Sequence, residues 1–151
     1  VLSGTYIDAS STKIQNVANG VNPNDAVNKA QLDAIAVGGG SAGDIIEKSV
    51  SLASNQSSFT DILGFSFSNS VVRSFKALVS IEISATSNLY EVFEIMGIQT
   101  SSGWLMNSMS VGDESGIIFN ITSLGQMQYS SINYSGFSSG KVKFRATTTS
   151  V

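Results

Sequence analysis

The stretch RSFKALVSIEISAT, from Arg73 to Thr86, alternates apolar and polar residues with a period of two. Every second residue from Phe75 to Ala85 is apolar, and the residues between them are polar except Leu78. Successive side chains of a β-strand point to opposite faces, so this pattern predicts a long strand with one buried face. It places the domain around it in the β class.

Seven further segments carry strand patterns. KVKFRAT, at Lys141–Thr147, alternates as regularly, and it would leave its three basic residues on a solvated face. The other candidates are Ile45–Leu52, Ile62–Phe67, Leu89–Ile98, Trp104–Val111, Ile117–Thr122 and Gln126–Tyr134. Turn-forming residues separate these segments at intervals of about 8–14 residues, and no Pro interrupts them. Residues 44–151 are therefore predicted to be mainly β, as an antiparallel β-sandwich or jelly roll.

Leu89–Ile98, LYEVFEIMGI, is apolar on both faces apart from Glu91 and Glu94. A strand of an antiparallel sheet normally shows one apolar and one polar face. Two apolar faces indicate a second layer beyond the partner sheet, and that layer could be another subunit.

Composition excludes several classes of function. The 151 residues carry a formal charge of −3, and 13% are charged against about 25% in typical soluble proteins. The basic residues are scattered apart from Lys141, Lys143 and Arg145, so the basic footprint of a nucleic-acid-binding protein is missing. No apolar run reaches the roughly 18 residues of a membrane-spanning helix.

The sequence contains neither Cys nor His. Disulfides and Ser–His or Cys–His catalysis are therefore excluded, and a zinc site is disfavoured. Glu91 and Glu94 stand three apart on a predicted strand and so face opposite sides, unlike the paired carboxylates of a glycosidase. GDESG, at Gly112–Gly116, could hold Ca²⁺ through Asp113 and Glu114, although such sequences are usually tight hairpin turns. We expect no enzyme, no cofactor and no metal.

The composition changes once along the chain. Four Gly within residues 38–43 predict a flexible hinge between a stem at residues 1–37 and a β-domain at residues 44–151. Short strands are possible at Thr5–Ala9 and Lys13–Val17. The start VLSGTYIDAS has neither Met nor a secretory signal, so we expect a fragment of a longer protein.

The stem should contain one short helix at Ala26–Val37, with Asn24 or Asp25 as its N-cap after turns at Asn19-Gly20 and Asn22-Pro23. A helix of about twelve residues is marginal alone. Its apolar residues are small or medium in size and lie on more than one stripe, which favours packing against copies of itself.

The segment KIQNVANGVNPNDAVNKAQLDA, within Ile7–Ala34, resembles the stalk and neck segments of phage tail fibres. The shared pattern is a K-I-x-N-V/L-A strand, an N/D-P-x-D-A turn and an A-V-N/T-K-x-Q/Y-L/V-D helix start. A similar D-A-V-N-x-x-Q-L pattern occurs in the necks of trimeric autotransporter adhesins. The resemblance implies a homotrimer with three helices around an axis. The segments VVRSFKALVSIEISA, EVFEIMGIQ and GKVKFRATT are similar to the modules at fibre tips, which implies contact with a bacterial surface and a location in the virion tail, outside the cell.

Aromatic residues near amides are the candidate ligand-binding residues. Aromatic rings offer flat apolar faces to sugars, and hydroxyl and amide groups bind sugar hydroxyls. Core packing is the alternative for each ring, and the loop-like SINYSGFSSG at Ser131–Gly140 makes Tyr134 and Phe137 the strongest candidates. The full set is Trp104, Tyr129, Asn133, Tyr134 and Phe137.

These features favour a trimeric phage tail fibre tip that binds a host receptor, either a glycan such as lipopolysaccharide or an outer-membrane protein. The alternatives are a trimerisation and folding cap without receptor contact, the tip of a tail-derived bacteriocin, and a bacterial trimeric adhesin. A capsule-degrading enzyme ranks last.

Overall fold

The computed structural model describes residues 17–22, 25–36 and 42–151. The chain forms two compact units, Val1–Gly39 and Gly40–Val151, and each is described by itself. The strand predicted at Thr5–Ala9, most of the one at Lys13–Val17 and most of the predicted hinge lie outside the described residues.

The first unit contains helix α1, at Lys29–Ala36, which starts three residues later than predicted. Asn28, rather than Asn24 or Asp25, is the N-cap. The backbone N–H of Gln31 donates to Asn28 Oδ1 at 3.0 Å, and the N–H of Asn28 donates to Gln31 Oε1 at 3.3 Å. This reciprocal pair is a capping box, and the sequence spacing N-x-x-Q could have identified it.

Asp25 closes the turn before the helix instead. Its Oδ2 accepts hydrogen bonds from the backbone N–H groups of Asn22 and Val21, at 2.8 and 2.9 Å. These donors favour the charged carboxylate and so lower the pKa of Asp25, the one from Asn22 most strongly.

The second unit contains eight strands, and the mainly β, antiparallel prediction is confirmed. Each strand overlaps one predicted segment. In chain order they are β1 Ile45–Leu52, β2 Thr60–Ser66, β3 Val72–Ser84, β4 Leu89–Thr100, β5 Gly103–Gly112, β6 Ile118–Ile121, β7 Gln126–Ser130 and β8 Ser139–Ser150.

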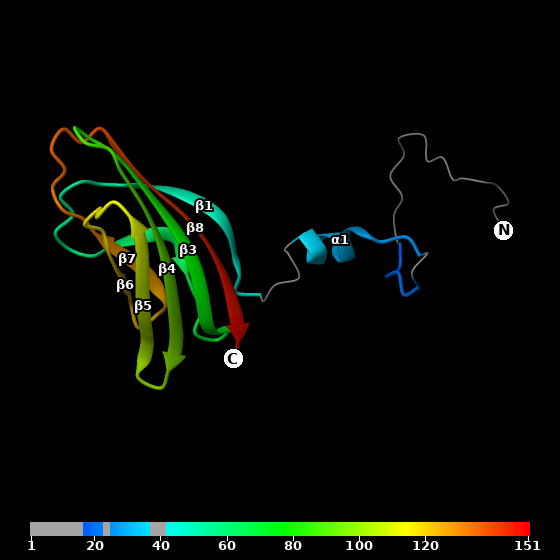
Figure 1. The fold of residues 1–151 in the computed structure, drawn as a ribbon. Helices are drawn as coiled ribbons and strands as arrows, with labels where there is room; N and C mark the ends of the chain where they lie inside the picture. Colours follow the sequence, from blue (N-terminus) through cyan, green and yellow to red (C-terminus); the bar gives the residue numbers. More distant parts are fainter. Residues whose placement is uncertain (1–16, 23–24, 37–41) are drawn as a thin grey trace, which may run out of the picture. The chain divides into compact units, whose positions relative to one another are not determined.

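The strands form two antiparallel sheets, one with the order β1-β8-β3-β4-β5 and one with the order β2-β7-β6 (Figure 1). The first strand pairs with the last and the second with the second-last, as in a jelly roll. The β3-β4-β5 meander widens the larger sheet instead of crossing to the smaller one. Ile45 pairs with Ala146, so residues at the two ends of the unit lie side by side.

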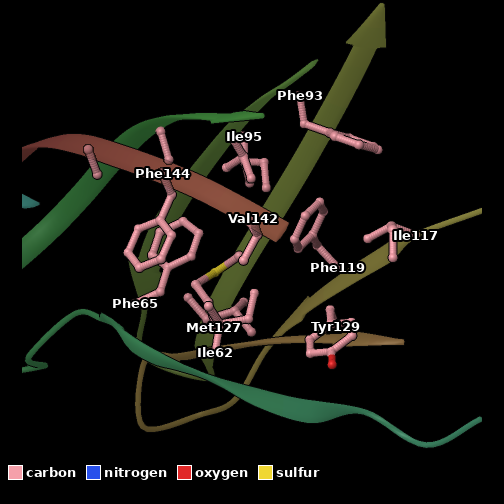
Figure 2. Close-up of a cluster of buried hydrophobic side chains, with 14 of the residues drawn as sticks. Ile62, Phe65, Phe93, Ile95, Ile117, Phe119, Met127, Tyr129, Val142 and Phe144 are labelled. Atoms are coloured by element: carbon pink, nitrogen blue, oxygen red, sulfur yellow. The ribbon is translucent and has the colours of Figure 1, made fainter. Parts of the chain in front are cut away.

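The core lies between the inner faces of the two sheets. Rings from facing strands stack in it, with Phe65 on Phe144 at a centroid distance of 4.2 Å and Phe67 on Phe75 at 4.0 Å. Figure 2 shows Phe65 and Phe144 side by side, with Ile62 and Met127 among the surrounding side chains. The alternation of β3 is confirmed, because its inward residues are buried and Leu78 lies exposed on the outer face.

The β-domain has two distinct ends (Figure 1). The chain joins it at what we call the proximal end, where Asp44 Oδ1 accepts hydrogen bonds from the N–H and hydroxyl of Thr148, at 2.6 and 2.7 Å. The β2–β3 and β4–β5 turns also lie at this end. The β1–β2, β3–β4 and β7–β8 connections lie at the opposite, distal end.

Candidate functional site

Four connections form a distal loop cluster, which comprises residues 53–59, 85–88, 113–117 and 131–138. Backbone hydrogen bonds join the β7–β8 connection to its neighbours. The N–H of Asn55 donates to the carbonyl of Ile132 at 2.9 Å, and that of Thr86 donates to the carbonyl of Ser135 at 3.0 Å. Loops held in this way present a defined surface on a rigid sandwich, as binding loops commonly do.

Tyr134 anchors the cluster from inside. Its hydroxyl donates to the carbonyl of Ser115 at 2.8 Å, and its backbone N–H donates to Ser54 Oγ at 2.9 Å. Burial, and secondly the negative charge of Glu91, raise the pKa of Tyr134 to about 12, with a smaller contribution from Tyr129. The ring stacks on Phe137 at a centroid distance of 6.0 Å. Tyr134 therefore acts in this structure as a buried support for the loops.

The two candidate carboxylates of β4 lie apart, as the strand spacing predicted. Glu91 faces inward, where it accepts hydrogen bonds from the hydroxyl and backbone N–H of the buried Ser115. Glu94 faces outward and forms an ion pair with Lys76 at 2.9 Å. The two groups therefore cannot act together on one bond.

The GDESG loop behaves as a turn. Asp113 Oδ2 accepts a hydrogen bond from the N–H of Tyr90 at 2.9 Å, and the N–H of Asp113 donates to the carbonyl of Tyr90 at 2.8 Å. Within residues 17–22, 25–36 and 42–151, no three acidic side chains gather in a way that could hold a metal ion.

The structure separates the five predicted ligand-binding residues. Trp104 lies at the proximal end, where its Nε1 donates to Asn69 Oδ1 at 2.8 Å and its ring contacts Phe67 and Phe75. Tyr129 is buried, and its hydroxyl accepts the N–H of Ala53. Core atoms thus cover the rings of Trp104, Tyr129 and Tyr134, so these rings have no free face for a sugar.

Asn133 is exposed and Phe137 is half-buried, both within the distal loop cluster. These two have surface available to a ligand. Ligand binding by any of the five residues stays a prediction.

A groove of about 430 Å³ crosses the outer face of the larger sheet toward its distal end. Glu82 on β3 pairs with Tyr90 on β4 and with Lys141 on β8, so these three side chains form a row across the strands. Tyr90 is 55% exposed. The outward-facing lining of this distal groove consists of Ser80, Glu82, Tyr90, Val92, Val111, Lys141 and Lys143.

Sequence reasoning missed Tyr90 as a site residue. The period-two pattern of Leu89–Ile98 places Tyr90 on the face opposite the buried Phe93, and this was the signal available. Tyr90 lies at one end of this row, with Glu82 between it and Lys141. Its exposed ring can stack on the apolar face of a sugar, and the neighbouring carboxylate and ammonium groups can bind hydroxyl or anionic groups.

A second groove, of about 550 Å³, lies on the same outer face toward the proximal end. Its apolar side chains come from β4 and β5, with Leu105 63% exposed and Ile98 48% exposed. The outward-facing lining of this proximal groove consists of Ser74, Lys76, Met96, Ile98, Leu105, Asn107, Thr147 and Thr149.

The comparisons with known proteins concern both units. Residues 13–50 match the family described as the coiled stalk of trimeric autotransporter adhesin, over about a quarter of the chain. This match extends through α1 and into β1. The tailspike protein of Acinetobacter phage vB_ApiP_P1 is similar in structure, with a TM-score of 0.43 and 14% identity, over 74% of this chain and 21% of that protein. The search of curated proteins finds no match.

No helix in the described part of the chain has the length and apolar character needed to cross a bilayer.

Proposed function

We propose that this chain is part of a homotrimeric fibre of a phage tail, with a stem that trimerises and a β-domain that binds a receptor on the bacterial surface. The proposal places the protein outside the cell, on the virion. The observation that carries the trimeric fibre is the match of residues 13–50 to the coiled stalk of trimeric autotransporter adhesin, a range that includes the start of β1.

The first unit supports assembly into a trimer. Helix α1 has only eight residues, and a helix of that length is not stable alone. Val21, Val27 and Leu32 are exposed on the isolated unit, at 87%, 59% and 58%. Packing of three copies around an axis would bury such residues and supply the stability that one copy lacks.

The arrangement of the two ends of the β-domain supports a receptor-binding role for its distal end. The chain joins the domain at the proximal end, beside Thr148, and the distal loop cluster lies at the opposite end (Figure 1). In a fibre, the end of the domain opposite to the point where the chain enters it is free to be presented to a cell.

The chemistry of the distal end suits a surface glycan. Tyr90 offers a flat ring, Lys141 and Lys143 offer cations, and Glu82 offers a hydrogen-bond acceptor. Asn133 and Phe137 are the predicted contacts from the loops. Weak binding at three such sites adds by avidity, so the fibre needs no tight individual site. The proposal includes binding without chemistry, which the separation of Glu91 from Glu94 and the lack of His support.

Two measurements test this function. Native mass spectrometry should give three times the 15.8 kDa chain mass, and a monomer would contradict the trimer. Adsorption of the labelled trimer to a panel of bacteria should then identify a binding strain. On that strain, Tyr90→Ala and Lys141→Ala should each weaken binding by about tenfold, since an aromatic contact or a charged hydrogen bond contributes about 1–3 kcal/mol.

Lys48→Ala is the matched control. It removes an exposed Lys whose Nζ donates to the carbonyl of Gly64 on β2, and Lys48 pairs with the inward-facing Phe144, so it lies away from the outer face that carries the distal groove. It should leave adsorption unchanged. If Tyr90→Ala, Lys141→Ala, Asn133→Ala and Phe137→Ala all adsorb like wild type, the receptor does not bind at the distal end.

A second candidate is a bacterial trimeric adhesin, which the family description of residues 13–50 favours. It shares the trimer and the distal binding end with the first candidate. The two differ in the surface recognised, so binding to host tissue components rather than to bacteria would favour the adhesin.

A further inference from the structure

We propose that the proximal groove is the surface through which neighbouring β-domains of the trimer pack against one another. This inference rests on the proposed trimer and adds a second assembly surface to the stem. It assigns a role to the apolar outer face of β4 and β5.

The outer face of the larger sheet is divided by composition. On β8 and β3 the outward residues are mostly hydroxyl-bearing or charged, as on a solvated sheet face. On β4 and β5 they include Met96, Ile98, Leu105, Met109 and Val111, all exposed. Contiguous exposed apolar residues on a folded domain indicate a contact surface.

The proximal groove has the anatomy of an interface. Ile98 pairs with Leu105, so two apolar side chains lie next to each other across β4 and β5, and Met96 and Asn107 form the next outward-facing pair. Polar groups lie beside them, with Ser74 Oγ hydrogen-bonded to Thr149 Oγ1 at 2.7 Å and Lys76 paired with Glu94. An apolar centre with a hydrogen-bonding rim is typical of protein–protein contacts.

The length of the connection argues that a second copy occupies the groove. Helix α1 ends at Ala36 and β1 begins at Ile45, so the linking residues span at most about 30 Å. The groove lies close to this point of attachment, because Asp44 binds Thr148 and the flanking Thr147 and Thr149 line the groove.

A trimerised stem would therefore tether three β-domains, each with its proximal groove, by short connections. The local concentration of neighbouring domains is then in the millimolar range, so even a weak apolar contact is occupied by a sister copy. In a threefold ring the contact is heterologous, and each groove receives a different surface of the next copy.

The absence of Cys from the sequence allows a direct test in the full chain. Leu105→Cys places one thiol in the proximal groove, and Ile132→Cys places one in the distal loop cluster. In one isolated chain the two positions have similar exposure, 63% and 52%. The rate of maleimide labelling is measured for each native variant and again in guanidinium chloride, after native mass spectrometry of the same samples.

The expected result is a trimer in which the thiol at 105 reacts at least about tenfold more slowly than in guanidinium chloride, while the thiol at 132 reacts at nearly its denatured rate. A native trimer in which both thiols react freely would overturn the inference and leave the proposed trimer intact. A monomeric wild type would instead overturn the proposed trimer, and the inference with it.

Leu105→Glu checks the same surface by charge. It should raise the concentration at which the trimer dissociates, whereas Ile132→Glu should leave that concentration unchanged. Equal dissociation of the two variants would count against the groove as an interface.

Discussion

At the scale of single residues, Tyr134 shows how one buried hydroxyl supports a surface loop. Its bond to the carbonyl of Ser115 joins the β7–β8 connection to the β5–β6 connection. The apolar surroundings that hold the ring also oppose its ionisation, and Glu91 adds a negative charge nearby. Tyr134 therefore stabilises the distal end only while it is protonated.

Tyr134→Phe should lower the free energy of unfolding by about 1 kcal/mol at pH 8, because the Ser115 carbonyl loses its donor. Since the folded pKa is raised to about 12, the contribution of Tyr134 is complete below pH 10 and declines as pH rises toward 12. Urea unfolding should show that the difference in free energy of unfolding between wild type and variant is smaller at pH 11 than at pH 8. Tyr90→Phe, which changes an exposed Tyr, is the control. If the difference in free energy of unfolding between wild type and Tyr134→Phe is the same at both pH values, this account is wrong.

Residue identity alone could not separate supporting rings from binding rings. Trp104 and Tyr134 sit in segments without a regular alternation, and their burial depends on which strand of the other sheet faces them. Tyr129 sits in the alternating segment QMQYS, which places it on the same buried face as Met127. Strand geometry places Tyr90 and Phe93 on opposite faces, but Leu89–Ile98 is apolar on both faces, so the sequence does not say which of the two faces is buried. The opposite orientation of Glu91 and Glu94 followed from strand geometry alone and is confirmed.

At the scale of elements, the pairing of β3 with β4 depends on the one Gly that faces the core on β4. Gly97 lies opposite Phe75, and a Cβ at Gly97 would overlap Cε1 of that ring and lie 2.6 Å from Cζ. The ring cannot easily move away, because Phe67 stacks on it at 4.0 Å.

Gly97→Ala should therefore lower the free energy of unfolding by about 1–3 kcal/mol, as overpacking of a filled core does. Urea unfolding monitored by Trp104 fluorescence measures it, since the indole contacts Phe75. Ser108→Ala changes an exposed residue on the neighbouring β5, outside both grooves, and should shift the free energy of unfolding by less than about 0.5 kcal/mol. If Gly97→Ala is as stable as the wild type, Phe75 and Phe67 are packed loosely enough to make room for the added methyl group.

The strands of the β-domain were predictable from the sequence. All eight strands were predicted, since period-two alternation and turn residues are local signals. The helix start was misplaced because Asn24, Asp25 and Asn28 are all suitable caps, and the N-x-x-Q spacing that singles out Asn28, seen in its hydrogen bonds with Gln31, was not used. Sheet order was not predictable, because it depends on pairing between residues about a hundred positions apart, such as Ile45 and Ala146.

At the scale of the whole molecule, two surfaces are proposed to hold three chains together, the stem and the proximal groove. A protein whose folded state is a trimer is stabilised by mass action, so its melting temperature depends on its own concentration. In a single chain, the described residues of both units include exposed apolar side chains, among them Leu32 and Leu105, which assembly would bury.

The melting temperature should fall by about 2–4 °C for each tenfold dilution, because dilution weakens the stabilisation that assembly gives to the folded state. The size of the shift follows from the unfolding entropy expected for a chain of this length. Differential scanning fluorimetry across a hundredfold range of concentration measures this. Leu63→Glu, on β2 of the smaller sheet, should keep the same dependence. A melting temperature independent of concentration would contradict assembly through either surface.

The position of β8 between β1 and β3 also governs the order in which the domain can be made. During synthesis β1 has no neighbour in its own sheet until residues 139–150 leave the ribosome, so that sheet cannot close while the chain grows. Contacts between strands so distant in sequence make folding slow. A chain cut short before Ser139 lacks β8, so β1 has no partner in its own sheet and β3 loses one of its two partners. Only the complete chain can therefore form the larger sheet.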